Sequence, residues 1–276
     1  MTEKRRLRLV DTTLRDGEQR AGLAFSVEQK IACALLMDQA GVDQIEAGIP
    51  AMCEEERAAI AAILRRRARA RIATWNRMNE SDIRASLSLG PDIIHIAVPV
   101  SDIQIRTKLR RTHEFVAEGM KRCIALAQSG GAEVSVGFED ASRGDLLFMT
   151  GLVRTAVSMG VPRIRYADTV GVAYPSKIQR EAGALCGAGA VLECHAHDDL
   201  GMAVANSLQA AVSGAEYVDT TFFGIGERAG NCDFARFIRA ARPVFSLGVP
   251  ESGEVLAELE SRILTILRLR RLGIRQ

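Results

Sequence analysis

Short apolar runs recur eight times along this chain, at intervals of roughly 30 residues, and a segment with helical spacing follows each run. Buried parallel strands read as continuous apolar runs, which is the pattern of IIHIAV and VSVGF. Eight such strand and helix units predict an α/β fold, a (β/α)8 TIM barrel. The eight runs are 7–10, 42–47, 71–75, 93–98, 133–138, 163–166, 191–195 and 217–222.

An open, doubly wound sheet is the competing fold. It would usually carry a glycine-rich phosphate loop after its first strand, and DTTLRDGEQ is not such a loop. The first helix has recognisable ends, because Ser26 with Gln29 three residues later forms a capping-box pattern and Gly41 follows the last helical position.

The eighth unit ends near residue 242, which predicts a catalytic barrel domain over 1–242 and a linker with an amphipathic helix over 243–276. Proline and glycine residues interrupt the chain after 242, and a helical pattern resumes over 254–271. An apolar stripe at helical spacing must be buried against the barrel or against a partner subunit. The stripe consists of Leu256, Leu259, Ile263 and Ile266, widened by Leu267.

Composition excludes several classes of protein. The 36 basic and 34 acidic residues leave a net charge of +2, which does not indicate a protein that binds nucleic acid. No apolar stretch approaches the roughly 18 residues of a membrane span. The N-terminal sequence lacks the apolar run of a signal peptide, and the six cysteines form no CxxC pair, so we expect a cytoplasmic protein.

The segment ECHAHDD carries the strongest chemical signal. Alternate side chains share one face of a strand, so Glu193, His195 and His197 should point together into the barrel mouth. Two imidazoles at this spacing bind one ion if an oxygen ligand completes the site. Two hydrogen-bonded core histidines are the alternative, but two of the four histidines in the chain fall here beside carboxylates, which favours a metal.

Two further segments follow strands near this one in a closed ring, the eighth strand beside it and the first strand with only the eighth between them. DTTLRDGEQ follows the first strand, where Asp16 could reach the ion and Arg15 would supply a cation. GIGERAGN follows the eighth strand, where three glycines allow a close backbone path and Asn231 could complete the metal shell. Taken alone, DTTLRDGEQ fits a surface turn equally well, and GIGERAGN is typical of a turn.

Together these three segments resemble the family of homocitrate, isopropylmalate and citramalate synthases, which are metal-dependent barrel enzymes that condense an acyl-CoA with a 2-oxo acid. The order of the motifs is the family's, and further matches occur in GVDQIEAGIPA, VSVGFEDASR and RYADTVG. The stretches ATWNRM, IAVPVSD and GFEDASR are most similar to the nitrogen-fixation type of homocitrate synthase.

The resemblance implies a role for each matching residue. Asp16, His195 and His197 would bind a divalent ion, zinc, iron(II), manganese or magnesium, with Asn231 close to it. Arg15 and Glu139 would be catalytic, the first stabilising charge on the keto oxygen and the second assisting enolisation of acetyl-CoA. The remaining roles are substrate binding by Gln19, Thr169 and Arg77, and support of the metal ligands by Glu193.

The chain departs from the family beyond the barrel. Family members continue into a segment of HESGIH type, where a histidine and a tyrosine assist proton transfer, often in the neighbouring subunit's site. The tail here has PESGE but no histidine or tyrosine. We therefore expect a homodimer that binds the keto acid but condenses slowly unless another protein supplies the relay.

Two other functions stay open at this point. A retro-aldol lyase of the hydroxymethylglutaryl-CoA lyase type would carry a cysteine within the glycine loop, whereas Cys232 follows the loop. A barrel that binds metal and keto acid without catalysis is the other alternative. The sequence leaves the identity of the keto acid and of the metal undecided.

Overall fold

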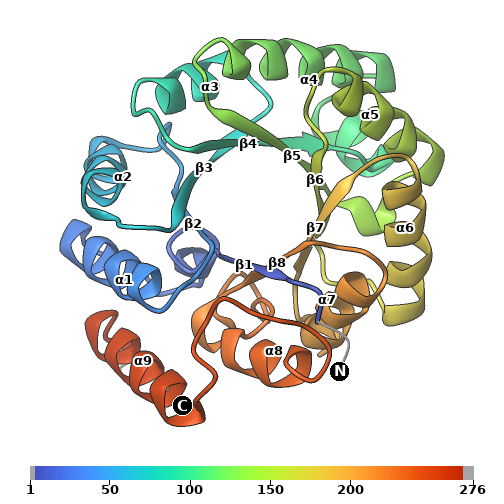
Figure 1. Ribbon diagram of the computed structural model, residues 1–276. Coiled ribbons are helices and arrows are strands. Elements are labelled where there is room, and N and C mark those ends of the chain that lie inside the picture. The colour runs from blue at the N-terminus through green and yellow to red at the C-terminus, as the bar shows by residue number, and fades with distance from the viewer. Residues whose placement is uncertain (1–3, 270–276) are drawn as a thin grey trace.

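The computed structural model describes residues 4–269, and its centre is a closed barrel of eight parallel strands in sequential order (Figure 1). The strands are β1 (Arg8–Asp11), β2 (Gln44–Gly48), β3 (Arg71–Arg77), β4 (Ile93–Pro99), β5 (Glu133–Glu139), β6 (Arg163–Asp168), β7 (Val191–Ala196) and β8 (Tyr217–Thr220). The predicted (β/α)8 barrel with a C-terminal helical tail is confirmed.

A helix follows every strand and covers the outside of the ring (Figure 1). These helices are α1 (Val27–Gln39), α2 (Glu54–Arg66), α3 (Glu80–Leu87), α4 (His113–Gln128), α5 (Leu146–Ser158), α6 (Pro175–Gly187), α7 (Ala203–Val212) and α8 (Phe234–Ala241), and α9 (Gly253–Ile266) comes last. Four short segments lie in loops after strands: η1 (Gly17–Gln19), η2 (Ile103–Lys108, a π-helix), η3 (Ala141–Arg143) and η4 (Phe222–Gly224).

The start of α1 shows how the sequence sets the helix ends. The Ser26 side chain accepts a hydrogen bond from the backbone N–H of Gln29, and the Gln29 side chain accepts one from the backbone of Ser26. This is the predicted capping box, which satisfies two backbone donors that have no partner inside the helix. Gly41 has φ +84° and a neighbouring carbonyl where a Cβ would lie, so only glycine fits the turn into β2.

Two different environments line the two faces of the strands. The outward face contributes apolar side chains such as Ile45, Ile72 and Ile94, which are fully buried under the helices. The inward face carries charged groups. Arg165 pairs in register with Glu193, and both are almost completely buried. The interior of the barrel is therefore held by ion pairs instead of the branched apolar layers usual for this fold.

The tail helix α9 packs on the barrel itself. Leu256, Leu259 and Ile263 of the predicted stripe are buried, and α9 contacts α1, beside which it lies in Figure 1. The Gln29 side chain also donates a hydrogen bond to the Ile266 carbonyl at 2.7 Å. Of the two predicted surfaces for the stripe, the barrel is the one it contacts. The helix ends at Ile266, earlier than expected, and residues 270 and 271 lie outside the described residues.

The division into a catalytic domain over 1–242 and a tail over 243–276 remains a prediction. Within residues 4–269 we find no helix with the length and apolar content needed to traverse a bilayer.

Replacing Ile263 by alanine should lower the free energy of unfolding by about 2–4 kcal/mol, because it opens a cavity under a fully buried side chain. Val255, on the same helix, is 50% exposed, so Val255→Ala should change stability by less than about 0.5 kcal/mol. Urea unfolding followed by circular dichroism measures both. A loss in Ile263→Ala as small as that expected for Val255→Ala would mean that the packing of α9 contributes little to the stability of the barrel.

Candidate metal centre and catalytic pocket

A cavity of about 160 Å³ opens at the carboxyl ends of the strands, where barrel chemistry is expected. It is lined by Arg15, Asp16, Gln19, Trp75, His95, Ala97, Gly137, Glu139, Arg165, Ala167, Thr169, His195, His197 and Glu227. Most of the residues singled out from the sequence are therefore brought together here.

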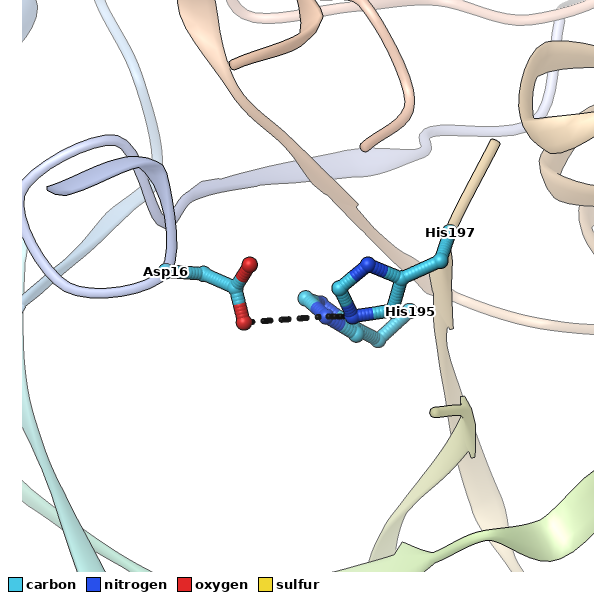
Figure 2. Close-up of side chains that lie close together, drawn as sticks. All are labelled: Asp16, His195 and His197. Atoms are coloured by element: carbon cyan, nitrogen blue, oxygen red, sulfur yellow. Dashed lines mark hydrogen bonds and ion pairs between the residues drawn. The ribbon is translucent and has the colours of Figure 1, made fainter. Parts of the chain in front are cut away.

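Asp16, His195 and His197 form a cluster in the wall of this cavity. Nε2 of His195 lies 3.3 Å from Nε2 of His197 and 3.5 Å from Oδ2 of Asp16. One ligand atom from each of the three residues lies within 4.8 Å of the others. Figure 2 shows the Asp16 carboxylate facing both imidazole rings across a small gap. Two imidazole nitrogens and one carboxylate oxygen in this arrangement form three of the ligands of a divalent metal.

Asn231 lies against these ligands in the way a further metal contact would. Its Nδ2 donates to Oδ1 of Asp16 at 2.7 Å, while its Oδ1 is buried without a hydrogen-bond partner. Buried oxygens without partners are rare, and a cation is one way to satisfy such an atom. The residues present therefore fit a divalent ion.

Local geometry explains how three separate segments meet here. His195 is the last residue of β7 whose side chain faces the inside of the barrel. An isolated β-bridge pairs His197 with Asn231. Gly226 allows the glycine loop to approach, because a Cβ there would lie 2.0 Å from Nδ2 of Asn231 and 3.1 Å from Oδ1 of Asp16. The close backbone path expected of this loop is thus present.

The electrostatics of the cluster favour positive charge at its centre. Burial alone would raise the pKa of Asp16, but Arg15 and the two histidines lower it well below its usual value. Burial would lower the pKa of His195, but hydrogen bonds to Asp16 and Asp219 raise it to about 9. Burial and the charge of His195 lower the pKa of His197 to about 4. Without an ion, a proton on His195 provides the cation between the carboxylates.

Asp219, on β8, orients His195 and was not found from the sequence. Nδ1 of His195 donates to Oδ2 of Asp219 at 2.9 Å, which leaves Nε2 to face Asp16 and His197. A carboxylate behind a ligating histidine fixes its tautomer and strengthens it as a ligand. The signal was present in YVDT, because the alternation of β8 places Asp219 on the inward face.

Arg15 is held by carboxylates from two elements. Its Nε donates to Oε1 of Glu46 at 2.5 Å, its Nη1 donates to Oδ2 of Asp16 at 2.5 Å, and its guanidinium lies 5.6 Å from the Trp75 ring centre. Within residues 4–269 no protein acceptor takes its Nη2. Burial would raise the pKa of Glu46, but Arg15 and Arg165 lower it to about 2. Glu46, on β2, was also missed from the sequence.

Glu193 does not touch the metal ligands directly. Its oxygens accept hydrogen bonds from Nε of Arg163 at 2.8 Å and from Nε of Arg165 at 2.5 Å, below the histidines. Arg165 in turn lies 3.0 Å from Asp219. Any support from Glu193 would therefore act through Arg165 and Asp219.

Of the residues predicted to bind substrate, Gln19 and Thr169 line the cavity, and so does the predicted catalytic Glu139. Arg77 does not. Its side chain is 65% exposed and bonded to both carboxylate oxygens of Asp82, which is buried at the start of α3. The structure therefore does not support a place for Arg77 in the pocket, because Asp82 holds its guanidinium away from it.

The chain should bind a divalent ion more tightly as the pH rises towards about 9, because His195 must release a proton from Nε2 to become a ligand. Asp219→Asn should weaken binding about 10- to 100-fold, and His195→Ala should weaken it further. Calorimetric titration with Mn²⁺ or Co²⁺ in two buffers measures both affinity and proton release.

Glu118→Gln, on the exposed surface of α4, is the matched control and should bind metal as the parent does. Unchanged affinity in Asp219→Asn and His195→Ala would remove this cluster as the metal site.

Comparisons with known proteins show which family this chain belongs to and agree with its fold. The HMGL-like family profile matches residues 6–245. Homocitrate synthase subunit alpha from Clostridium pasteurianum is 43% identical over 95% of this chain and 98% of its own length. Homocitrate synthase from Frankia alni is 42% identical over 93% of this chain and 74% of its own length.

Among solved structures, hydroxymethylglutaryl-CoA lyase from Pseudomonas aeruginosa has a TM-score of 0.82 and covers 97% of this chain and 95% of its own. Its identity of 22% extends the likeness to the fold alone. The family profile spans most of the chain, and the homocitrate synthase relatives confirm the resemblance predicted from the motifs, so the chain belongs to the HMGL-like family.

Proposed function

We propose that this chain is a homocitrate synthase-like acyltransferase that condenses acetyl-CoA with a 2-oxo acid, 2-oxoglutarate being the first candidate. The observation that carries the proposal is the cluster of Asp16, His195 and His197 beside the buried cation Arg15, in a chain about 40% identical to homocitrate synthases. The cluster suits a ligand with adjacent carboxylate and keto oxygens.

Arg15 and the metal ligands face the place where the keto group would bind. Asp16, His195 and His197 would hold a divalent ion, which would supply a Lewis acid for the keto carbonyl. Arg15 adds a fixed cation, since Glu46 and Asp16 hold its guanidinium and leave Nη2 for a ligand oxygen. A donor positioned in advance stabilises the alkoxide that forms, with little reorganisation during the reaction.

The wall of the cavity is suited to orient the keto acid. The Thr169 hydroxyl oxygen accepts a hydrogen bond from the Asp140 backbone N–H at 2.8 Å, so its own proton is free to donate to a carboxylate. Gln19 lines the same cavity as Arg15. We assign the substrate carboxylate to these two residues.

Glu139 is the candidate base for acetyl-CoA. Its carboxylate lines the cavity, and the Gln104 side chain donates to it at 3.3 Å. In the proposed step the carboxylate takes a proton from the acetyl methyl group and the resulting enolate attacks the keto carbon. The alkoxide that forms takes up one proton, which balances the proton given to Glu139. Water then cleaves the thioester, which gives the tertiary hydroxy acid and releases the CoA thiol.

The lyase alternative is less well supported by the geometry. A lyase of the hydroxymethylglutaryl-CoA type would carry a cysteine in the glycine loop, yet Cys232 lies after that loop and is fully buried. Burial raises the pKa of its thiol, and Cys232 does not line the cavity. A thiol in this position has no access to a bound ligand.

The partner chain and the cellular location are also proposals. The relative from Clostridium pasteurianum, 98% of whose length is covered by the match, is named as a subunit of homocitrate synthase. That name supports a second, different chain as a partner in the active enzyme. The homodimer expected from the sequence is the other arrangement, and sedimentation of the purified chain distinguishes them. A cytoplasmic location is supported by the cysteines, all of which are free thiols.

Incubation with acetyl-CoA, Mn²⁺ and a panel of 2-oxo acids should release free thiol with one acid preferred. Arg15→Ala should lower kcat by about 10² to 10³ and change keto-acid binding less, because Arg15 neutralises charge that develops in the transition state. Arg84→Ala is the control and should keep the parent rate, because Arg84 is exposed and pairs only with Glu80 on α3 among the residues that the structure describes.

An unchanged kcat in Arg15→Ala would remove this residue from catalysis. Cleavage of hydroxymethylglutaryl-CoA without any condensation would establish the lyase. A parent rate of about 1–10 s⁻¹ from the chain alone would mean that the proton relay lies within the barrel.

A further inference from the structure

The turn that follows β5 contains a residue in a strained backbone conformation. Asp140 has φ +61° and ψ +38°, which is the left-handed region. Few residues other than glycine adopt this conformation, because it brings the Cβ too close to the following carbonyl oxygen. Five non-glycine residues in the described part of the chain have positive φ, and Asp140 is the one that is buried. Such a residue persists only where its surroundings hold it, and such residues are concentrated at functional sites.

The side chain of Asp140 holds this turn in place. The Ser101 hydroxyl donates to Oδ2 of Asp140 at 2.5 Å. The Arg143 guanidinium donates through Nε to Oδ1 at 2.9 Å and through Nη2 to Oδ2 at 2.7 Å. Because Ser101 follows β4, these contacts join the loop after β4 to the turn after β5. Glycine would adopt the same φ at a lower cost, but it has no carboxylate for either partner.

The turn also directs a backbone donor to a residue of the catalytic cavity. The ladder between β5 and β6 ends where Phe138 lies beside Tyr166. Beyond that pair, the backbone N–H of Asp140 donates to the hydroxyl oxygen of Thr169 at 2.8 Å. A backbone N–H can only donate, so the hydroxyl accepts from it and has its own proton left to donate elsewhere. Thr169 lines the cavity, and so does Glu139, the residue before Asp140.

We propose that Asp140 is a positioning residue that orients the Thr169 hydroxyl towards the carboxylate of the keto acid. This inference rests on the proposed function, which assigns that carboxylate to Thr169 and Gln19. A hydroxyl without a fixed donor can rotate and offer a lone pair, which repels a carboxylate, as readily as its proton. The N–H of Asp140 removes this freedom before the ligand arrives, so binding costs less reorganisation. Asp140 is fully buried and does not line the cavity, so its effect on a ligand passes through Thr169.

The test measures 2-oxoglutarate binding by calorimetry on the purified chain saturated with Mn²⁺. Asp140→Ala removes the carboxylate and disfavours the turn, so it should weaken binding about 10-fold, the loss expected for one hydrogen bond to a charged group. Asp140→Asn should stay within about 3-fold of the parent, because asparagine tolerates positive φ and still accepts from Ser101. Mn²⁺ affinity should be unchanged in both variants, because the cluster of Asp16, His195 and His197 does not include this turn.

A double-mutant cycle separates positioning from a general loss of structure. Thr169→Val keeps the shape of the side chain without its hydroxyl and should itself weaken 2-oxoglutarate binding about 10-fold. Since Asp140 acts through that hydroxyl, Asp140→Ala should add less than about a 2-fold loss when Thr169 is already valine. Independent effects would instead multiply to about 100-fold. Asp140→Gly, which adopts positive φ without steric cost, replaces Asp140→Ala in the cycle if the alanine variant does not fold.

Asp92→Asn is the matched control. Both carboxylate oxygens of Asp92 accept from Arg67, as those of Asp140 accept from Arg143. Asp92 precedes β4 and therefore lies at the end of the barrel opposite the cavity. Its variant should be less stable in thermal unfolding but bind 2-oxoglutarate as the parent does. Circular dichroism checks that every variant is folded.

The inference is overturned by parent affinity in Asp140→Ala, by losses that multiply in the double variant, or by an equal loss of Mn²⁺ affinity. A parent chain that binds Mn²⁺ but no 2-oxo acid contradicts the proposed function itself, and the inference fails with it. Weaker 2-oxoglutarate binding in Asp140→Ala supports the positioning role if Asp140→Asn restores the affinity and Thr169→Val abolishes the effect.

Discussion

The buried guanidinium of Arg165 is the group around which the barrel interior is organised. It lies 2.7 Å from Glu46, 2.5 Å from Glu193 and 3.0 Å from Asp219, and so connects β2, β7 and β8 through β6. Removing one member of such a buried network typically costs about 3–5 kcal/mol, since the remaining charges lose their partners. Loss of one member of this network would therefore remove a large share of the stability of the barrel.

The same network sets the geometry of the site above it. Glu46 holds Arg15 from below, and Asp219 holds His195, so each of these groups depends on a strand other than its own. Strands are more rigid than loops, and a catalytic group held by a strand keeps its orientation without a ligand. The floor of the barrel thus pre-organises both the metal ligands and the cation that faces the substrate.

The sequence predicts the parts of this arrangement that depend on local spacing. The period of the apolar runs gives the barrel, and the alternation in ECHAHDD places His195 and His197 on one face. Asp16 was correctly brought to them because strands one and seven are close in a closed ring. Each of these steps uses only the geometry of one element or the closure of the ring.

The sequence does not predict contacts that depend on register between distant strands. Glu46 and Asp219 are single acidic residues in short strands, and only the relative shift of β2, β6 and β8 brings them to Arg165. Arg77 was expected in the pocket, and a local contact explains why it does not line it. The alternation of β3 points it inward, but Asp82, five residues on, forms a two-oxygen pair with it outside the cavity. A competing local partner overrides the strand pattern.

Charge balance in the site explains why a cation belongs there. Asp16, Glu46, Glu193 and Asp219 are four buried carboxyl groups, and Arg15, Arg163 and Arg165 are the three guanidinium groups that face them. Hydrogen bonds to Asp16 and Asp219 raise the pKa of His195 to about 9, and burial raises the pKa of Asp219 to about 7, so without an ion a proton between His195 and Asp219 makes up the difference. A divalent ion at the histidines would replace that proton and leave an excess of positive charge. An anionic keto acid would offset this excess, so metal and substrate should each favour binding of the other.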